Sequence, residues 1–337
     1  MMSLKRGCKD TQVLSIQEIL VALGFMAEDW GDGLRVESIA VDGDFGPQTE
    51  AAVVAFQKEE GLFADGIVGP ATMQALQDAY MRRQLELTSP TADAAAGLPE
   101  RYRLVRVAAD RYLQGYSHLL LRSDAAEEYQ KVAEAVHEAG GILTSSGGIR
   151  SLDDHGGINR SRCSLHYVGL ALDLFVYSGM VDPKTDPYVI TRRDPEDLEA
   201  SYFQVWARCD PARARKDVAL PAKTLKCAVT YAKRGLRSES TEPDTEGCFL
   251  DLTSVFQKHG FRPIKPRPSF GKGGSIMSAE WWHFQYEKPL VPGVSTFGGE
   301  LLKLYSRSSL EGKGPWAERD RLFGINWCCA EPSPGGS

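Results

Sequence analysis

The sequence predicts an α+β protein, with a small all-α, three-helix domain at the N-terminus and a second domain that has a central antiparallel sheet flanked by helices. Three observations lead to this fold class. Residues 1–85 carry helical periodicity and paired turn motifs, residues 86–100 have the composition of a linker, and helical and strand-like segments alternate from residue 101 onwards. The chain has 337 residues, which is room for two domains, since domains commonly span roughly 100–200 residues.

The N-terminal segment predicts short helices separated by tight turns. Apolar residues recur at helical spacing from Val13 to Leu23, and Gly24 follows where a helix should end. Residues 42–49 and 65–72 then share the pattern Asp-Gly-x-x-Gly-Pro-x-Thr. Asp-Gly favours a tight turn, and Gly-Pro places proline in the first turn of a helix. A helix is therefore expected after each copy, with an apolar face formed by Ala52, Val53, Phe56, Met73 and Leu76.

These turn motifs resemble the three-helix peptidoglycan-binding domain. The match continues through Phe56-Gln57 and Gly61-Leu62 between the two copies. The resemblance implies that this domain binds glycan or stem peptide in a shallow groove, and the sequence does not identify the groove residues. Residues 86–100 are rich in Ala, Ser, Thr and Pro, which is typical of a linker. The second domain is therefore expected to span residues 101–337.

The second domain is expected to alternate helices and strands. Apolar periodicity, glycine stops and runs of β-branched or aromatic residues predict helices over residues 125–139 and 250–259, and strands over residues 142–144, 170–177 and 280–286. Residues 179 to 246, approximately, are polar and contain several prolines. This stretch is interpreted as an insertion of unknown role, with some helix over residues 195–208.

Two histidines stand near acidic residues at spacings that bear on metal binding. His166 precedes Asp173 by seven residues, and His283 follows Glu280 by three. Imidazole nitrogen and carboxylate oxygen bind zinc, and three protein ligands leave a position for water. Zinc lowers the pKa of that water from 15.7 to about 7, and a neighbouring carboxylate can act as general base. Odd spacings point to opposite faces of a regular strand, so a shared site needs a bend, which Gly169 could provide.

The wider pattern around these residues resembles a family of zinc peptidases. Ser-x-His-x-x-Gly-x-Ala-x-Asp, at residues 164–173, is followed by Glu-Trp-Trp-His-Phe at residues 280–284. This combination is similar to the D-Ala-D-Ala carboxypeptidase and dipeptidase family. That family shares its metal site with lysostaphin-type enzymes and with the Hedgehog signalling domain.

Two further segments agree with this resemblance. Residues 146–151 are similar to the family's Ser-Gly-Tyr-Arg-Ser, with Ile149 replacing the aromatic residue. Residues 256–261 stand ahead of the Glu-Trp-Trp-His motif, as a helix of the family does. The similarity covers roughly residues 125–177 and 250–286, so the insertion lies outside it.

The resemblance implies a zinc ion (Zn2+) bound by three residues, His166, Asp173 and His283. It implies that Glu280 is the general base and acid of the reaction. Arg150 would stabilise the oxyanion of the tetrahedral intermediate or hold a substrate carboxylate, and its planar fork of donors suits both tasks. Ser164 would contact the substrate.

Composition and charge narrow the classes of function. The net charge of −6 comes without a block of like charges, which argues against nucleic acid as a partner. No window approaches the roughly 18 consecutive apolar residues of a membrane span, and the polar N-terminus lacks the apolar region of a secretory signal. The seven cysteines contain no Cys-x-x-Cys pair and predict free thiols in a protein folded in the cytosol: Cys8, Cys163, Cys209, Cys227, Cys248, Cys328 and Cys329.

The leading hypothesis is a zinc-dependent peptidoglycan hydrolase that cleaves an amide bond of the stem peptide, as a D-Ala-D-Ala carboxypeptidase or an endopeptidase. Its N-terminal domain would hold it on the wall, which argues against a dipeptidase acting on soluble substrate. A phage endolysin cutting between L-Ala and D-Glu and a secreted antibacterial toxin stay open as alternatives. A wall-binding protein with a structural zinc site is the alternative of another class, and the presence of Glu280 argues against it.

The same hypothesis sets expectations for partners and location. Peptidoglycan is the expected partner of a monomeric protein, joined by an immunity protein if the chain is a toxin. Without a signal peptide, the chain is expected to be made in the cytoplasm. It would act on the cell wall, in the periplasm or outside the cell, after lysis or dedicated secretion.

Overall fold

The computed structural model describes residues 3–25, 39–88, 102–152, 164–179, 181–193, 202–218, 220–227, 244–267, 276–291 and 294–310. The chain divides into two compact units. The first consists of Met1–Leu104, Arg150–Val168 and Leu290–Ser337, and the second of Val105–Ile149 and Gly169–Pro289.

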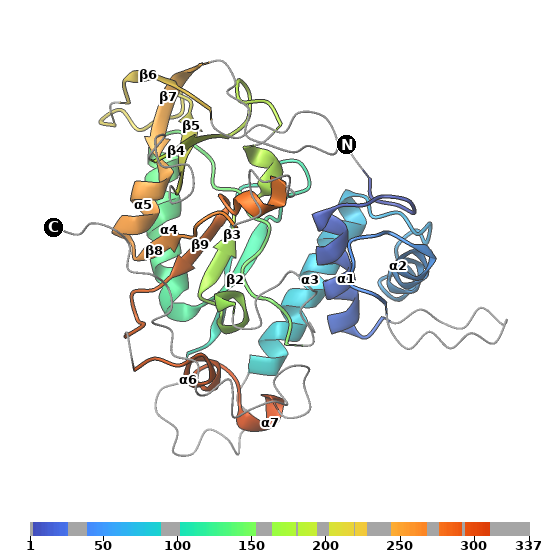
Figure 1. Cartoon of the computed structure of the whole chain (residues 1–337). Helices are drawn as coiled ribbons and strands as arrows, with labels where there is room; N and C mark the ends of the chain where they lie inside the picture. The colour runs from blue at the N-terminus through green and yellow to red at the C-terminus, as the bar shows by residue number, and fades with distance from the viewer. Residues whose placement is uncertain are drawn as a thin grey trace, which may run out of the picture. The chain divides into compact units, whose positions relative to one another are not determined.

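The first unit contains the three helices predicted for the N-terminal segment: α1 (Thr11–Leu23), α2 (Pro47–Glu59) and α3 (Pro70–Thr88) (Figure 1). Helix α1 ends as predicted at Gly24, whose φ of +85° is the left-handed conformation that glycine tolerates best. Helices α2 and α3 each begin at the proline of a Gly-Pro pair. The predicted apolar residues of α2 and α3 are buried: Ala52, Val53, Phe56, Met73 and Leu76.

The first copy of the turn motif is folded around Gln17, a residue of α1 that is 1% exposed. Its side-chain amide donates hydrogen bonds of 3.0 Å to the Asp42 carboxylate, the Asp44 carbonyl and the Thr49 hydroxyl. Its carbonyl oxygen accepts the backbone N–H of Gly43 at 2.9 Å. A single buried side chain therefore bonds to several polar groups of the turn, and it satisfies the buried Gly43 N–H and Thr49 hydroxyl.

The second copy repeats this arrangement around Gln57, which is also 1% exposed. Its amide donates to the Asp65 carboxylate, the Ile67 carbonyl and the Thr72 hydroxyl, at 3.0, 3.0 and 3.1 Å. Its carbonyl oxygen accepts the N–H of Gly66 at 2.9 Å. The sequence repeat is therefore a structural repeat, in which a buried glutamine from another element organises each Asp-Gly turn.

The second unit contains most of the strands. The described strands form sheets in the orders β1-β2, β3-β9-β8 and β4-β5-β7-β6. Their bounds are β1 (Leu104–Ala108), β2 (His118–Arg122), β3 (Ala171–Asp173), β4 (Tyr188–Arg192), β5 (Phe203–Cys209), β6 (Ala222–Leu225), β7 (Thr245–Asp251), β8 (Phe261–Pro263) and β9 (His283–Tyr286). The α+β fold class is thus confirmed, with the strands divided among small sheets. Every pair in the three- and four-stranded sheets is antiparallel.

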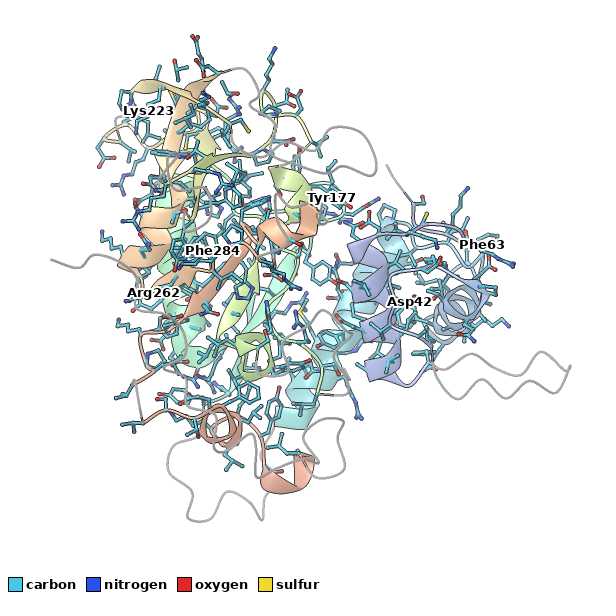
Figure 2. All side chains as sticks on the ribbon, in the orientation of Figure 1. Asp42, Phe63, Tyr177, Lys223, Arg262 and Phe284 are labelled. Carbon is cyan, nitrogen blue, oxygen red and sulfur yellow. The ribbon has the colours of Figure 1, made fainter. Side chains whose placement is uncertain are left out.

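Two helices cover the sheets of this unit. Helix α4 (Ser123–Glu138) contacts β2 and α5 (Leu252–Lys258), and α5 contacts β5 and β8 (Figure 1). Both helices match the predicted positions to within a few residues. Phe256 of α5 stacks on Phe284 of β9 with ring centroids 4.2 Å apart, and Figure 2 labels Phe284 among the dense side chains of this unit. This aromatic contact joins α5 to the three-stranded sheet.

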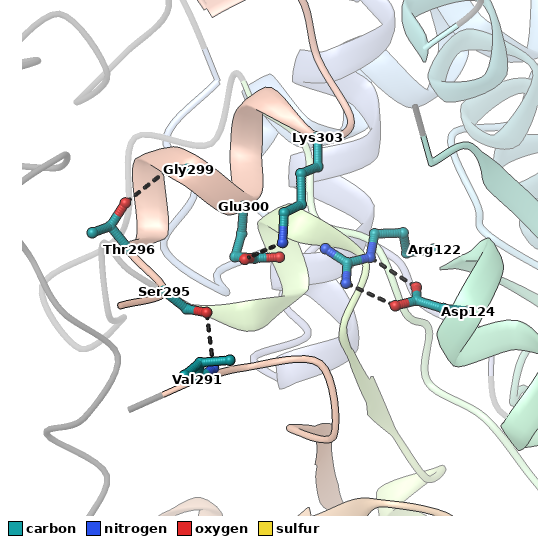
Figure 3. Close-up of polar contacts among 8 residues, drawn as sticks. All are labelled: Arg122, Asp124, Val291, Ser295, Thr296, Gly299, Glu300 and Lys303. Carbon is teal, nitrogen blue, oxygen red and sulfur yellow. Dashed lines mark hydrogen bonds and ion pairs between the residues drawn. The ribbon is translucent and has the colours of Figure 1, made fainter. Parts of the chain in front are cut away.

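Ion pairs support the ends of several elements (Figure 3). Arg122, at the end of β2, is fully buried and makes two hydrogen bonds of 2.8 Å to the Asp124 carboxylate. In the first unit, helix α6 (Phe297–Leu302) begins at the capping hydroxyl of Thr296. The buried carboxylate of Glu300 in α6 pairs with Lys303 at 2.7 Å. A short helix, α7 (Arg307–Leu310), follows.

The prediction of helix over residues 195–208 is wrong for residues 203–208, which belong to β5. Alternate residues of β5 are buried, which is the period-two pattern of a strand with one covered face. The buried residues are Phe203, Val205, Ala207 and Cys209. Much of the predicted insertion thus folds as the four-stranded sheet, and residues 195–201 lie outside the described part of the chain.

The predicted strand at residues 142–144 is also wrong, because side chains take the place of strand partners there. The Asp110 carboxylate accepts the backbone N–H of Leu143 at 2.6 Å. The Tyr188 hydroxyl accepts the N–H of Thr144 at 2.8 Å. The segment is buried and hydrogen bonded without belonging to a sheet.

The two other predicted strands are shorter than expected. Of residues 170–177, only β3 is strand, and a 3-10 helix η3 (Val176–Ser178) follows it. Of residues 280–286, strand β9 begins at His283. Among the helices that the structure describes, none has the length and apolar character needed to cross a membrane.

Candidate metal centre

Two of the predicted zinc ligands face each other across the sheet of the second unit. Asp173, the last residue of β3, is paired in register with His283, the first residue of β9. The next pair along is hydrogen bonded, from the Leu174 N–H to the Trp282 carbonyl at 2.9 Å. Hydrogen-bonded and non-bonded pairs alternate, so Asp173 and His283 form a non-bonded pair, in which side chains lie closest. Nδ1 of His283 is 3.0 Å from Oδ1 of Asp173.

His166 lies in the 3-10 helix η2 (Leu165–Val168), just before β3, and is 4% exposed. The carbonyl of Ser164 accepts the N–H of Tyr167 at 3.1 Å, closing the first turn of η2. The His166 carbonyl accepts the backbone N–H of Arg150 at 3.2 Å. Gly169 has φ of +67° and provides the bend that the odd spacing of His166 and Asp173 required.

One ligand atom from each of His166, Asp173 and His283 lies within 4.8 Å of the other two. Metal–ligand distances near 2.1 Å place the ligands of a tetrahedral zinc roughly 3.4 Å apart, so small side-chain rotations suffice to bind the ion. Two imidazoles and one carboxylate are also a ligand set of catalytic zinc sites. Within the described ranges, no other three His, Cys, Asp or Glu residues are arranged to hold a metal.

Glu280 directly follows the 3-10 helix η4 (Ile276–Ala279), which precedes β9, and is 7% exposed. Its carbonyl accepts the N–H of His283 at 3.2 Å, so a turn connects it to the start of β9. Its φ of +53° is left-handed, which costs a residue other than glycine about 1–2 kcal/mol. Such strain concentrates at functional sites. The backbone therefore bends at Glu280. Such a bend is what Glu280 and His283, three residues apart, require to share one site.

Arg267 is the partner of the Glu280 carboxylate, and sequence reasoning gave it no role. Its Nε donates a hydrogen bond to Oε1 of Glu280, and its backbone N–H donates to the Ser278 carbonyl at 2.8 Å. The Arg267 side chain is 44% exposed, whereas that of Glu280 is 9% exposed. The sequence around Arg267 alternates Lys, Arg and Pro and carries no periodic signal, so only the fold shows this contact.

The predicted Arg150 segment is connected to the same strand. The N–H of Ser146 donates to the Asp173 carbonyl at 2.7 Å, and the N–H of Asp173 donates to the Gly147 carbonyl at 2.9 Å. Arg150 is partly exposed, and its guanidinium lies 5.6 Å from the centre of the Tyr167 ring. A cation–π contact of this kind holds the guanidinium in place.

Comparison with known proteins agrees with both resemblances. Residues 9–76 match the family model described as "Putative peptidoglycan binding domain". The chain is 33% identical over 137 residues to a zinc D-Ala-D-Ala carboxypeptidase of Streptomyces albus G, a match that covers 40% of this chain and 50% of that protein.

Other similar proteins are named as N-acetylmuramoyl-L-alanine amidases. The chain is 41% identical over 76 residues to a probable N-acetylmuramoyl-L-alanine amidase of Bacillus licheniformis, covering 23% of this chain and 19% of that protein. It is 38% identical over 80 residues to an N-acetylmuramoyl-L-alanine amidase of Mycobacterium tuberculosis, covering 24% of this chain and 20% of that protein. The matches span half or less of the length of these relatives. The predicted resemblance is thereby confirmed, in a peptidoglycan-binding domain at the N-terminus and a zinc D-Ala-D-Ala carboxypeptidase among the relatives.

Proposed function

We propose that this chain is a zinc-dependent peptidoglycan hydrolase that cleaves an amide bond of the stem peptide. The observation that carries the proposal is the close approach of His166, Asp173 and His283, which together offer the ligands of a catalytic zinc site. A buried glutamate three residues before His283 supplies the general base that such a reaction needs. The similarity to a zinc D-Ala-D-Ala carboxypeptidase supports both the metal and the substrate class.

In the proposed mechanism, His166, Asp173 and His283 hold the zinc ion. When bound, zinc polarises the scissile carbonyl and lowers the pKa of a water molecule. Glu280 accepts the proton of the attacking water and delivers it to the leaving amine. Arg267 holds one oxygen of Glu280 through its Nε, which leaves the second oxygen to carry the proton.

Arg150 has a separate role in this proposal. Its guanidinium offers a rigid fork of donors, which suits either the oxyanion of the tetrahedral intermediate or a carboxylate of the substrate. Its backbone hydrogen bond to the His166 carbonyl fixes the main chain at that position. Ser164, at the start of η2, is proposed to contact the substrate.

The N-terminal domain is proposed to hold the enzyme on its insoluble substrate. Tethering raises the local concentration of cleavable bonds without new contacts at the active site. A binder of polymeric wall suits a carboxypeptidase or endopeptidase, because a soluble dipeptide offers nothing to hold. We therefore propose that the enzyme works on the cell wall, and we expect it to act there as a monomer.

The test is to digest purified sacculi with the full chain and to identify the released fragments by mass spectrometry. Release of D-Ala would indicate a carboxypeptidase, loss of cross-linked dimers an endopeptidase, and new N-terminal D-Glu an L-Ala–D-Glu endopeptidase. Elemental analysis should find about one zinc per chain, and a chelator should abolish cleavage until zinc is restored. A metal-free protein that still cleaves, or a zinc-loaded protein that releases nothing, would overturn the proposal.

A further inference from the structure

We propose that Cys209 and Cys248 form a reversible disulfide across the four-stranded sheet. The inference rests on the register of that sheet and is independent of the proposed zinc chemistry. Cys209 ends β5, and Cys248 lies in the middle of β7 directly opposite it. Both are thiols in the structure.

The register places the Cα atoms of Cys209 and Cys248 at a separation that a disulfide can span. Opposed residues of antiparallel strands project from the same face, with Cα atoms about 4.5 or 5.5 Å apart. Disulfides span Cα separations of about 4.4–6.8 Å, so both spacings are compatible with a bond. Rotation of two side chains is sufficient, and the strands need not separate.

A third cysteine of the same sheet region lies on the other face. Cys227 is 2% exposed and packs in a buried cluster with Val189 and Phe249. Phe249 follows Cys248 in β7, and neighbouring residues of a strand point to opposite faces. The guanidinium of Arg208 lies 5.0 Å from the Phe249 ring, which places Arg208 on that face and Cys209 on the opposite one. Cys227 is therefore directed away from the Cys209–Cys248 pair.

The surroundings of the pair favour a disulfide over a metal site. In the part of the chain that the structure describes, the group around His283 is the one cluster of three or more residues suited to a metal, and it contains no cysteine. Two thiols alone supply too few ligands for a structural zinc, which takes four.

The two thiols differ in exposure, and this sets the order of the reaction. Cys248 is partly exposed, whereas Cys209 is 5% exposed. Burial raises the pKa of the Cys209 thiol, so Cys248 is the better first nucleophile. With oxidised glutathione as oxidant, the Cys248 thiolate attacks one glutathione sulfur and releases the other glutathione as a thiolate. The Cys209 thiolate then attacks the Cys248 sulfur and releases the second. Two protein thiols are oxidised, one glutathione disulfide is reduced, and the two protons pass to the glutathione thiolates.

A disulfide here would close the segment between the two residues, which includes β6. Cross-linking Cys209 to Cys248 would stabilise the folded state mainly by restricting the conformations of the unfolded chain. The thermal midpoint of the oxidised protein should therefore rise by roughly 5–10 °C. Reduction with dithiothreitol should reverse the shift.

The experiment uses the folded full-length chain with oxidised glutathione, followed by alkylation under non-reducing conditions, proteolysis and mass spectrometry. The proposal expects one peptide that joins Cys209 to Cys248 and disappears on reduction. Cys209→Ser and Cys248→Ser should each abolish that peptide and the thermal shift, whereas Cys227→Ser should retain both. Stable glutathione adducts on Cys248 without the cross-link, or a cross-link of Cys248 to another cysteine, would overturn the proposal. Zinc content and wall hydrolysis of the reduced protein do not enter these readouts.

Discussion

At the scale of single residues, Glu280 and His283 should respond differently to substitution, because one is proposed as a base and the other as a ligand. Glu280→Gln is nearly isosteric and should keep the zinc while losing about 10²–10⁴-fold in rate, the usual contribution of general base catalysis. His283→Ala should instead lower zinc occupancy. Zinc content and hydrolysis rate are measured side by side for both variants. A fully active Glu280→Gln variant would show that the base lies elsewhere.

Arg267 is expected to act through Glu280, and a double-mutant cycle tests this coupling. Arg267 donates a hydrogen bond to the Glu280 carboxylate through its Nε. Hydrogen bonds to charged groups contribute about 1.5–3 kcal/mol. Arg267→Gln should therefore lower kcat by roughly tenfold with little change in KM. In the Glu280→Gln background, the same substitution should have almost no further effect. Equal losses in both backgrounds would mean that Arg267 acts independently of Glu280. Arg262, which pairs with Glu287 at the end of β9, is the matched control, and Arg262→Gln should leave kcat unchanged.

The sequence identifies the three candidate zinc ligands but not the contact between Arg267 and Glu280, the proposed base. His166, Asp173 and His283 stand in patterns with fixed spacing, and a family resemblance can carry such patterns onto a new chain. The contact between Arg267 and Glu280 forms because the segment after β8, which contains Arg267, lies against the 3-10 helix before β9. No local sequence pattern predicts this tertiary contact. The left-handed φ of Glu280 was unpredictable for the same reason, because strain of this kind is imposed by the surrounding fold.

At the scale of elements, the buried glutamines of the two turn repeats should carry much of the stability of the N-terminal helices. Gln57→Ala would remove the common partner of two buried groups, the Gly66 N–H and the Thr72 hydroxyl, whereas the exposed Asp65 carboxylate can bond to water instead. Each unsatisfied buried polar group costs about 1–3 kcal/mol, so a loss of roughly 2–4 kcal/mol in unfolding free energy is expected. Urea unfolding followed by circular dichroism measures it. Gln48→Ala, at an exposed position of α2, should change the free energy by less than about 0.5 kcal/mol.

A buried carboxylate before β4 should make stability depend on pH. Asp186 is 2% exposed, and burial raises its pKa to about 6, although its carboxylate accepts the N–H groups of Val181 and Asp182 at 2.7 and 2.9 Å. Because this pKa is above the unfolded value of 3.8, its contribution is most favourable below about pH 4 and is lost as the pH rises through 6. Asp186→Asn should therefore flatten the pH dependence of unfolding between pH 4 and 6.

The same substitution should stabilise the protein at pH 7 by roughly 1–3 kcal/mol, because one pKa unit corresponds to about 1.4 kcal/mol. Urea unfolding of the parent and Asp186→Asn at pH 4 and pH 7 separates the two effects. The amide oxygen of asparagine can still accept the two N–H groups, so the turn itself should survive. A destabilisation at pH 7 that exceeds the one at pH 4 would show that the charge stabilises the turn after all.

Helices were easier to predict than strands in this chain, and the reasons are local. Helix α4 has a strong apolar stripe that ends at glycine, and α2 and α3 start at Gly-Pro. Strand β5 is a different case, because the alternation of Phe203, Val205 and Ala207 with other residues is visible in the sequence and favours a strand over the predicted helix. Residues 142–144 look like a strand in sequence, yet their N–H groups bond to side chains of Asp110 and Tyr188. Hydrogen bonds to side chains distant in the sequence, in place of bonds to a neighbouring strand, cannot be predicted from a single sequence.

At the scale of the whole molecule, the chain combines a peptidoglycan-binding domain, matched over residues 9–76, with the candidate zinc ligands His166, Asp173 and His283. The family match ends at residue 76, whereas helix α3 continues to Thr88. The last residues of α3, 86–88, therefore lie in the segment predicted as linker, residues 86–100. The domain limits of 1–85 and 101–337 stay a prediction, and a binding fragment is best designed to include all of α3.

We propose that the N-terminal helices bind the wall and that residues 101–337 hydrolyse it, so binding and hydrolysis should be separable. Residues 1–88 contain α1, α2, α3 and both glutamine-centred turns, so this fragment should fold and sediment with purified sacculi without releasing peptides. The full chain with Glu280→Gln should sediment equally well, because the substitution leaves the N-terminal helices untouched. Residues 101–337 should keep zinc and cleave small soluble muropeptides, while losing much of the activity on intact sacculi, since the tether no longer raises the local substrate concentration. Sedimentation of residues 101–337 with sacculi, together with a soluble 1–88 fragment, would place the wall-binding surface in the second part of the chain.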